Sequence, residues 1–221
     1  MHDLLFRGAR LIDGSGAPAR LADVAVDAGL ISAICDAEHA DQRPAARHVV
    51  ECGGLVLAPG FIDAHTHDDA LMLEKAPLQQ AHPKLSQGVT TVVIGNCGIS
   101  LAPLDAAVHH ELPPPLNILK REAFRFTSVA AYLDALAAQP PVCNVVTLLG
   151  HTSLRVKHLP DLQQEASAKQ AAAMAAEVGA ALQQGAWGLS TGVFYPPARA
   201  ATKDELIAVA RPLGPAGALL T

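Results

Sequence analysis

"GFIDAHTHDD", residues 60–69, carries two histidines one residue apart directly after an apolar stretch. Successive side chains of a β-strand point to opposite faces, so His65 and His67 are predicted to lie on one side while Thr66 faces away. The preceding residues 53–64, "GGLVLAPGFIDA", are almost continuously apolar, which is typical of a strand buried on both faces of a parallel sheet. Polar residues therefore begin where the predicted strand ends.

A pair of imidazoles at the carboxyl end of a buried parallel strand indicates a divalent-metal site, because α/β folds place their sites at that end. Zinc is the first choice for such a pair. Asp63 is a candidate to accept the second N–H of one imidazole, as oxygen atoms commonly do for metal-bound histidines. The alternatives are that His65 and His67 are solvated loop residues and that local backbone satisfies the charge of Asp63.

The composition limits the classes of protein and partner. The chain has 221 residues, 50% of them hydrophobic, with a mean hydropathy of +0.25, which predicts a globular protein and excludes a disordered one. The net charge of −5 and the absence of any Lys or Arg run predict a small-molecule substrate and neither a nucleic-acid nor a membrane partner. The N-terminal residues 1–14 lack an apolar signal segment, so we expect a cytoplasmic location.

The sequence pattern changes near residue 58 and divides the chain into two parts. Residues 1–57 are short alternating segments broken by turn signals and predict a small β-domain. From residue 58 onward, apolar runs alternate with Ala-rich helical stretches, which predicts parallel β/α units joined by right-handed crossovers. The predicted strands cover residues 88–98, 143–151, 185–192 and 217–221, and the predicted helices cover residues 126–139, 165–184 and 202–214. Either a barrel or an open doubly wound sheet is compatible, although no glycine-rich phosphate loop follows the first strand.

Further polar groups follow the later strands. Cys97 comes after an apolar run and stands between Asn96 and Gly98, where glycine permits close backbone approach and a thiolate could face the same point as the histidines. A buried cysteine that acts as a small hydrophobe is the alternative. His151 is interpreted as a hydrogen-bond donor to the site, as a substrate contact, or as a satisfied structural histidine.

The other cysteines and histidines have no such placement. Cys35, Cys52 and Cys143 are therefore assigned to packing. The four cysteines are widely spaced without a Cys-x-x-Cys pair, which argues against a disulfide framework or a zinc finger. His39 and His110 are among the histidines predicted to be solvated or to bond locally.

Four segments resemble the N-acyl-D-amino-acid deacylases (D-aminoacylases) of the amidohydrolase superfamily. They are "APGFIDAHTHDD" (58–69), "GVTTVVIGNCGISLAP" (88–103), "LLGHTSLR" (148–155) and "GAWGLSTGVFYPPARAAT" (185–202). The resemblance covers nearly the whole chain. It implies a metal-dependent (β/α)8 TIM-like barrel, begun by residues 58–221, beside a small β-sandwich to which residues 1–57 contribute.

The resemblance also implies an activity and a set of site residues. The activity is zinc-dependent hydrolysis of the amide bond of an N-acyl-D-amino acid to a carboxylate and a D-amino acid. His65 and His67 match the metal histidines of the first strand, and Cys97 matches the cysteine that replaces the usual bridging lysine. Phe194 and Tyr195 match a segment that lines the substrate pocket.

Dihydroorotases and hydantoinases are the alternative enzymes, but they use a carboxylated lysine at the fourth strand, and "GLSTG" (188–192) has none. Similar enzymes carry two more metal histidines and a catalytic aspartate after the fifth strand. We therefore expect the general base beyond Thr221 and a barrel truncated after about five strands, since a complete barrel needs roughly 250 residues. The 221-residue chain alone is expected to be inactive, and a non-catalytic fragment is the remaining alternative.

Overall fold

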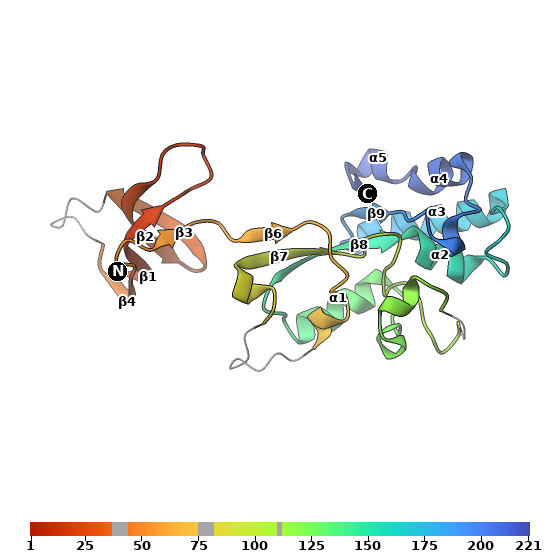
Figure 1. Ribbon diagram of the computed structural model, residues 1–221, viewed down its shortest axis with the longest axis horizontal. Helices are drawn as coiled ribbons and strands as arrows, with labels where there is room; N and C mark the ends of the chain where they lie inside the picture. The colour runs from red at the N-terminus through yellow and green to blue at the C-terminus, as the bar shows by residue number, and fades with distance from the viewer. Residues whose placement is uncertain (37–43, 75–81, 110–111) are drawn as a thin grey trace. The chain divides into compact units, whose positions relative to one another are not determined.

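The computed structural model describes residues 1–36, 44–74, 82–109 and 112–221. His39 and His110 lie outside the described residues. The chain divides into two compact units, Met1–Gly60 and Phe61–Thr221, each with its own set of strands (Figure 1).

The first unit is a five-stranded sheet. Its strand order is β3-β2-β1-β4, with β5 pairing alongside β1. The strands are β1 (His2–Leu11), β2 (Arg20–Asp27), β3 (Leu30–Asp36), β4 (Ala46–Glu51) and β5 (Val56–Leu57). The β2–β3 hairpin turns through Ala28 and Gly29, whose φ angles of 48° and 79° are those of the tight turn that matches strand twist. Leu11, Ala22 and Val24 form the small hydrophobic core of the first unit.

The second unit contains a parallel sheet whose strands follow one another in chain order. The strands are β6 (Phe61–Asp63), β7 (Val89–Ile94), β8 (Asn144–Gly150), β9 (Gly188–Ser190) and β10 (Leu219–Leu220). Every neighbouring pair is parallel, and the spatial order is β10-β9-β8-β7-β6. This order belongs to a (β/α) barrel, because a doubly wound sheet reverses its strand order at a switch point. The predicted barrel-type fold is thereby confirmed.

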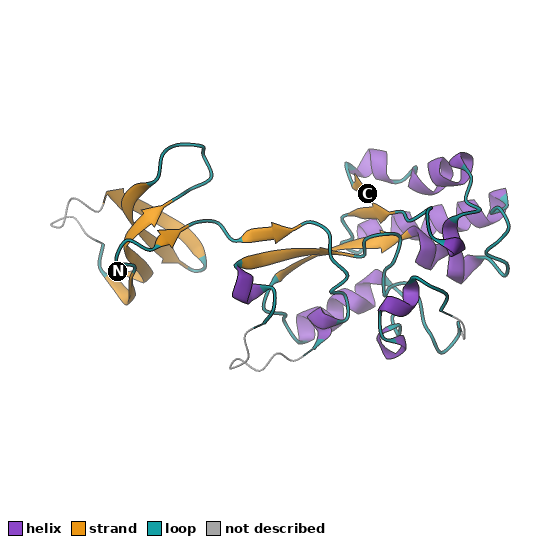
Figure 2. Ribbon diagram, viewed as in Figure 1, coloured by secondary structure: helices purple, strands orange, loops and turns teal. Residues whose placement is uncertain are grey.

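Helices alternate with these strands along the second unit, as Figure 2 shows. They are α1 (Val129–Ala138), α2 (His151–His158), α3 (Ala168–Gln183), α4 (Lys203–Ala210) and α5 (Leu213–Ala216). Short 3-10 turns η2 (Leu71–Leu73), η3 (Leu85–Gln87), η4 (Leu116–Ile118), η5 (Arg121–Ala123) and η6 (Pro196–Ala198) occupy the connections.

Hydroxyl side chains begin the three helices that the sequence predicts. Ser128 accepts a hydrogen bond from the backbone of Ala131 at α1, and Ser167 forms a capping box with Gln170 at α3. Thr202 caps α4 in the same way, because its side-chain oxygen accepts a hydrogen bond from the backbone N–H of Glu205. Helix α2 is not predicted, because only Leu154 and Val156 are apolar within it and most of its buried side chains are polar.

The stretch 53–64 differs from its prediction. It is divided between β5 in the first unit and β6 in the second. Phe61 and Ile62 are 68% and 67% exposed, so the prediction of a strand buried on both faces is wrong. The reason is that β6 ends the sheet and pairs with β7 alone among the described strands. An apolar run does not distinguish an edge strand from a central one.

The core of the second unit lies between the strands and the helices. Ile94, Leu149 and Leu189 from the strands are fully or almost fully buried, together with Met174 and Val178 from α3.

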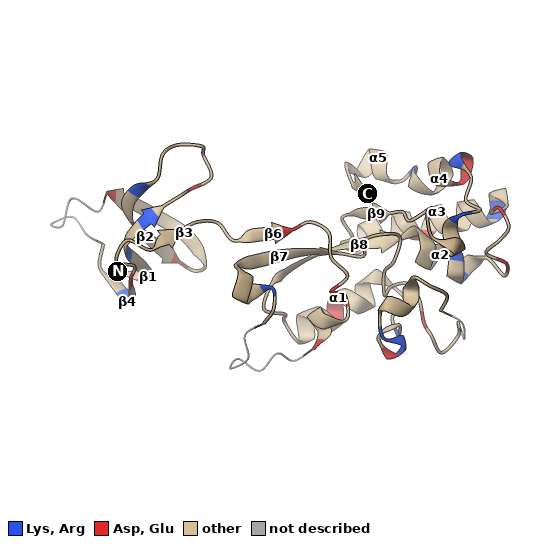
Figure 3. Ribbon diagram, viewed as in Figure 1, with Lys and Arg blue, Asp and Glu red and all other residues tan. Residues whose placement is uncertain are grey.

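Acidic and basic residues are interspersed along the elements (Figure 3). Within the described ranges, the helices are too short or too polar to cross a lipid bilayer.

Candidate metal centre

The ends of β6 and β7 bring three predicted metal ligands together. His65 and His67 follow β6, Cys97 follows β7, and one ligand atom from each lies within 4.8 Å of the others. The Nε2 atom of His65 is 3.1 Å from the Sγ atom of Cys97. In the described part of the chain this is the one such group of three or more His, Cys, Asp or Glu residues. Two imidazoles and a thiolate are a donor set that zinc accepts.

His67 is suited to bind as a neutral imidazole. Burial lowers the pKa of its ring below the ordinary value, and the neighbouring His65 lowers this pKa further. Its Nδ1 atom is buried and has no hydrogen-bond partner among the described residues. A buried nitrogen without a partner is costly unless something else satisfies it. The lowered pKa fits a metal ligand, because metals bind the deprotonated form of histidine. The unpartnered nitrogen fits one as well, because a metal ion would supply the missing partner.

A tight turn after β7 aims the thiol of Cys97. Gly95, Cys97 and Gly98 have positive φ angles of 79°, 55° and 77°. Residues other than glycine seldom adopt this left-handed conformation, so the cysteine is held there by its surroundings. A Cβ atom on Gly192 would lie 2.1 Å from the carbonyl oxygen of Cys97, and one on Gly95 would lie 2.1 Å from the carbonyl oxygen of Leu148. Glycine therefore lets the neighbouring strand ends pack directly against this turn.

Asp63 supports the histidine segment through the backbone. Its Oδ1 accepts a hydrogen bond of 3.2 Å from the backbone N–H of His65, and its Oδ2 lies 2.6 Å from the Nζ of Lys84. The bond from Lys84 is the main reason that the pKa of Asp63 is lowered. The contact that the structure shows therefore runs to the peptide of His65, whereas the sequence predicts one to an imidazole.

Lys84 and Asp69 are two charged residues of this region that sequence reasoning misses. Lys84 also lies 3.0 Å from Asp68, and no strand-end motif marks it. Asp69 is 1% exposed, and burial raises its pKa to about 7. Its carboxylate accepts a hydrogen bond of 3.4 Å from the backbone of Gly95, which ties the first strand end to the cysteine turn. The sequence alone does not show which of the two consecutive aspartates turns inward.

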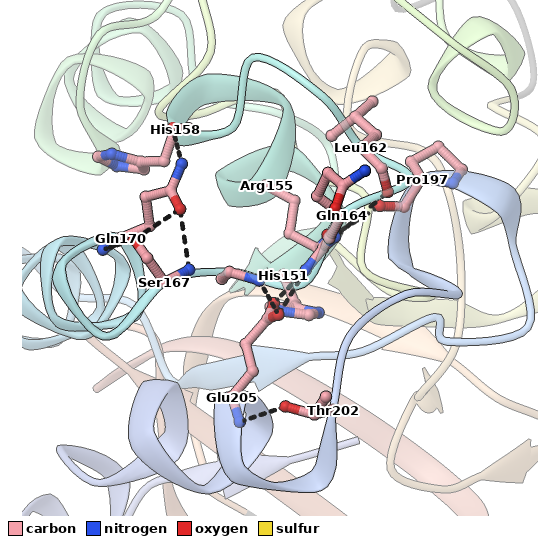
Figure 4. A network of polar contacts seen from close by, with 11 residues as sticks. His151, Arg155, His158, Leu162, Gln164, Ser167, Gln170, Pro197, Thr202 and Glu205 are labelled. Atoms are coloured by element: carbon pink, nitrogen blue, oxygen red, sulfur yellow. Dashed lines mark hydrogen bonds and ion pairs between the residues drawn. The ribbon is translucent and has the colours of Figure 1, made fainter.

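His151 lies in a buried ionic cluster, drawn in Figure 4. Its side chain is 0% exposed, and its Nε2 is 2.8 Å from Glu205 Oε1. Arg155 donates to both oxygens of Glu205, and its Nε donates to the carbonyl oxygen of Pro197 at 2.8 Å. These contacts hold the Nε2 side of the ring, whereas the buried Nδ1 has no hydrogen-bond partner among the described residues. The role of His151 as a substrate contact stays a prediction.

Glu205 stays charged inside this cluster. Burial by itself would raise its pKa, but the hydrogen bonds from His151 and Arg155 outweigh burial and lower the pKa to about 2. Sequence reasoning misses both Arg155 and Glu205. The only signal is the presence of a charged residue at an inward position of α2 and of α4, and recognising it requires knowing which helix faces are buried.

The aromatic pair after β9 is divided between two environments. The rings of Phe194 and Tyr195 are 5.7 Å apart in an edge-to-face arrangement, and Phe194 is 80% exposed. Tyr195 is half-buried and packs beside Gly192, where an added Cβ atom would lie 2.9 Å from the Tyr195 ring. Gly192 in turn contacts the backbone of Cys97. Tyr195 is thus close to the cysteine turn, and the role of both rings in substrate binding stays a prediction.

Comparison with known proteins agrees with this geometry. N-acyl-D-aspartate deacylase of Alcaligenes xylosoxydans xylosoxydans is 50% identical over 98% of this chain and 42% of its own length. The crystal structure of a D-aminoacylase superposes with a TM-score of 0.90 at 46% identity, over 100% of this chain and 44% of that one. The N-acyl-D-glutamate deacylase of Bordetella bronchiseptica, solved with zinc and a phosphonate inhibitor, gives 0.87 at 40% identity, over 99% and 44%.

The chain thus spans less than half the length of these relatives. The model of the amidohydrolase family matches residues 48–217, which include the histidine pair, the cysteine turn and the aromatic pair. The chain therefore belongs to the amidohydrolase family.

Proposed function

We propose that this protein is a zinc-dependent hydrolase that cleaves the amide bond of N-acyl-D-amino acids. The observation that carries the proposal is the convergence of His65, His67 and Cys97, whose ligand atoms lie within 4.8 Å of one another at the ends of adjacent parallel strands. Relatives that are 40% to 50% identical are deacylases of N-acyl-D-amino acids, and one of them was solved with zinc.

The three residues would hold the zinc ion through two neutral imidazoles and one thiolate. When bound, zinc supplies Lewis-acid polarisation of the scissile carbonyl and of water. Cys97 binds as the thiolate, because a coordinating thiol loses its proton. Asp63 fixes the peptide that precedes the His65 side chain, and the turn at residues 95–98 fixes the direction of the sulfur. We assign the general base to none of the described residues.

The substrate would be bound on the side of the metal residues where β9 ends. Tyr195 supports this placement, because it packs against the glycine that contacts Cys97. Phe194 would add apolar contact area, since its ring is largely exposed in this structure. In this proposal both aromatic rings contact the acyl or amino-acid part of the substrate, and the product pair is a carboxylate and a D-amino acid.

We also propose that the protein acts in the cytoplasm. All four cysteines are described and free, and Cys35 and Cys97 are half-buried. Free thiols that are partly accessible are typical of reducing compartments.

The test of the activity is a chiral assay on zinc-loaded protein. N-acyl-D-aspartate, N-acyl-D-glutamate and their L-enantiomers are supplied separately, together with a hydantoin and dihydroorotate. We expect amino acid to be released from the D-substrates and much less from the L-substrates. Preference for the cyclic amides or for L-substrates would reject the proposal, as would the lack of any hydrolysis by the full-length protein when that protein is shown to hold zinc through Cys97.

A further inference from the structure

The turn that carries Cys97 is closed by a side chain from a distant strand. Ser190, the last residue of β9, is 0% exposed. Its hydroxyl oxygen accepts a hydrogen bond of 2.9 Å from the backbone N–H of Gly98, and the same hydroxyl donates to the carbonyl oxygen of Gly95. One hydroxyl thus satisfies the two backbone groups at the ends of a four-residue turn, with Cys97 as its third residue.

The turn needs such an attachment because of its backbone conformation. Cys97 has a φ of 55°, in the left-handed region that an L-residue with a Cβ atom adopts at a cost. If the hydroxyl were removed, the N–H of Gly98 and the carbonyl of Gly95 would lose a buried partner. The turn would then gain by rearranging toward a negative φ at Cys97. Such a change moves the sulfur away from the Nε2 of His65, from which it is now 3.1 Å.

We propose that Ser190 is a positioning residue for the metal site, whose hydroxyl holds the turn of residues 95–98 so that the thiolate of Cys97 faces His65 and His67. This inference rests on the proposed role of Cys97 as a zinc ligand. Ser190 does not contact the metal residues' ligand atoms in this role. It acts through the backbone on either side of Cys97.

Ser153 provides a matched control. It is also 0% exposed, and its hydroxyl makes the same pattern of one accepted and one donated bond, each 2.9 Å, with the backbone N–H and carbonyl of Ser100. Ser190→Ala and Ser153→Ala therefore each remove one buried hydroxyl and two hydrogen bonds to the backbone. They differ in the backbone that loses these bonds. The hydroxyl of Ser190 bonds to Gly95 and Gly98, on either side of Cys97, whereas the hydroxyl of Ser153 bonds to Ser100.

The experiment titrates Co²⁺ into the metal-free protein and follows the sulfur-to-cobalt charge-transfer absorption. Cys97→Ala identifies the part of this signal that depends on Cys97. We expect Ser190→Ala to weaken Co²⁺ binding about 10- to 100-fold, as the loss of groups that orient ligands commonly does, and to shift or weaken the absorption. Ser153→Ala is expected to keep the wild-type affinity and spectrum. Equal affinities and spectra in the two variants would overturn the proposal.

A second measurement needs no metal. The rate of Cys97 alkylation is followed in metal-free protein that carries Cys35→Ser, so that the buried Cys52 and Cys143 are the other thiols. We expect Ser190→Ala to raise this rate several-fold over Ser153→Ala, because the half-buried sulfur becomes mobile. If the wild type gives no Cys97-dependent absorption, the proposed metal site fails. The alkylation rates then still decide whether Ser190 holds the thiol, and equal rates would show that it does not.

Discussion

The Nε2 atom of His65 lies 3.1 Å from the Sγ atom of Cys97, across the boundary between two neighbouring β/α units. At this distance the imidazole and the thiol either form a hydrogen bond or coordinate the same metal ion. The second arrangement is the one for which the structure also provides His67, with its buried and unpartnered Nδ1.

The first prediction concerns the cysteine ligand. Cys97→Ala should lower the zinc content of the protein and, with it, any deacylase activity, because the thiolate is the anionic member of the three ligands found among the described residues. Elemental analysis measured alongside turnover checks this result. Cys143→Ala is the control, since Cys143 is buried and its Sγ donates to the carbonyl oxygen of Val89. Zinc content that is the same in both variants would return Cys97 to a packing role.

The second prediction concerns the buried charge cluster. Glu205→Gln should destabilise the fold by about 3–5 kcal/mol, because it leaves the guanidinium of Arg155 buried without its counter-charge. Urea unfolding measures the change in the free energy of unfolding. The control is Glu177→Gln, which breaks a partly exposed contact with Lys157 and His158 and should cost about 1 kcal/mol or less. Similar losses in both variants would show that the cluster has no special weight.

The third prediction is the acid dependence of stability that Glu205 contributes. Its pKa is lowered from the usual 4.5 to about 2, so the unfolded chain binds a proton at this group at higher pH than the folded protein does. The stabilisation is fully present above the unfolded pKa and is lost as the pH falls toward the folded pKa. Between about pH 2 and about pH 5, Glu205→Gln should therefore show a smaller rise in stability than the wild type. Parallel pH profiles for the two proteins would contradict the assignment.

The fourth prediction tests the close packing behind the cysteine turn. Gly192→Ala places a Cβ atom 2.1 Å from the carbonyl oxygen of Cys97, so one of the two strand ends must move. We expect a loss of about 1–3 kcal/mol in the free energy of unfolding together with weaker zinc binding. Gly214→Ala is the control, because an added Cβ there meets no atom within 4 Å. If Gly192→Ala binds zinc like the control, the turn tolerates the displacement.

The metal residues are the part of the site that the sequence predicts best. His65, His67 and Cys97 each follow an apolar run, and the carboxyl ends of neighbouring parallel strands meet at one edge. Local pattern locates these residues, because polar side chains begin where the apolar runs stop. The strand period does not apply to the two histidines, since β6 ends at Asp63 and both follow it. The strands β7 to β10 and the helices α1, α3 and α4 are predictable as well, because apolar runs and Ala-rich helical stretches alternate along this part of the chain.

The residues that the sequence does not reveal act through partners far along the chain. Ser190 bonds to Gly95, which is 95 positions away, and Glu205 bonds to Arg155, which is 50 positions away. No local period records such a pairing, because it depends on which helix and strand faces meet after folding. The exposure of Phe61 and Ile62 is missed for a related reason, since it depends on the number of neighbours that β6 has.

The parallel strands lie side by side in the order in which they are synthesised. His65, His67 and Cys97 all leave the ribosome before Ser190, and at about 5–20 residues per second the stretch from residue 97 to residue 190 takes on the order of ten seconds. During translation the sulfur and the two imidazoles are therefore present for several seconds before β9 is made. Any metal ion that a nascent chain binds in this interval is held by a Cys97 thiol whose turn does not yet have its hydrogen bonds to Ser190. The addition of β9 then sets the final geometry around the ion.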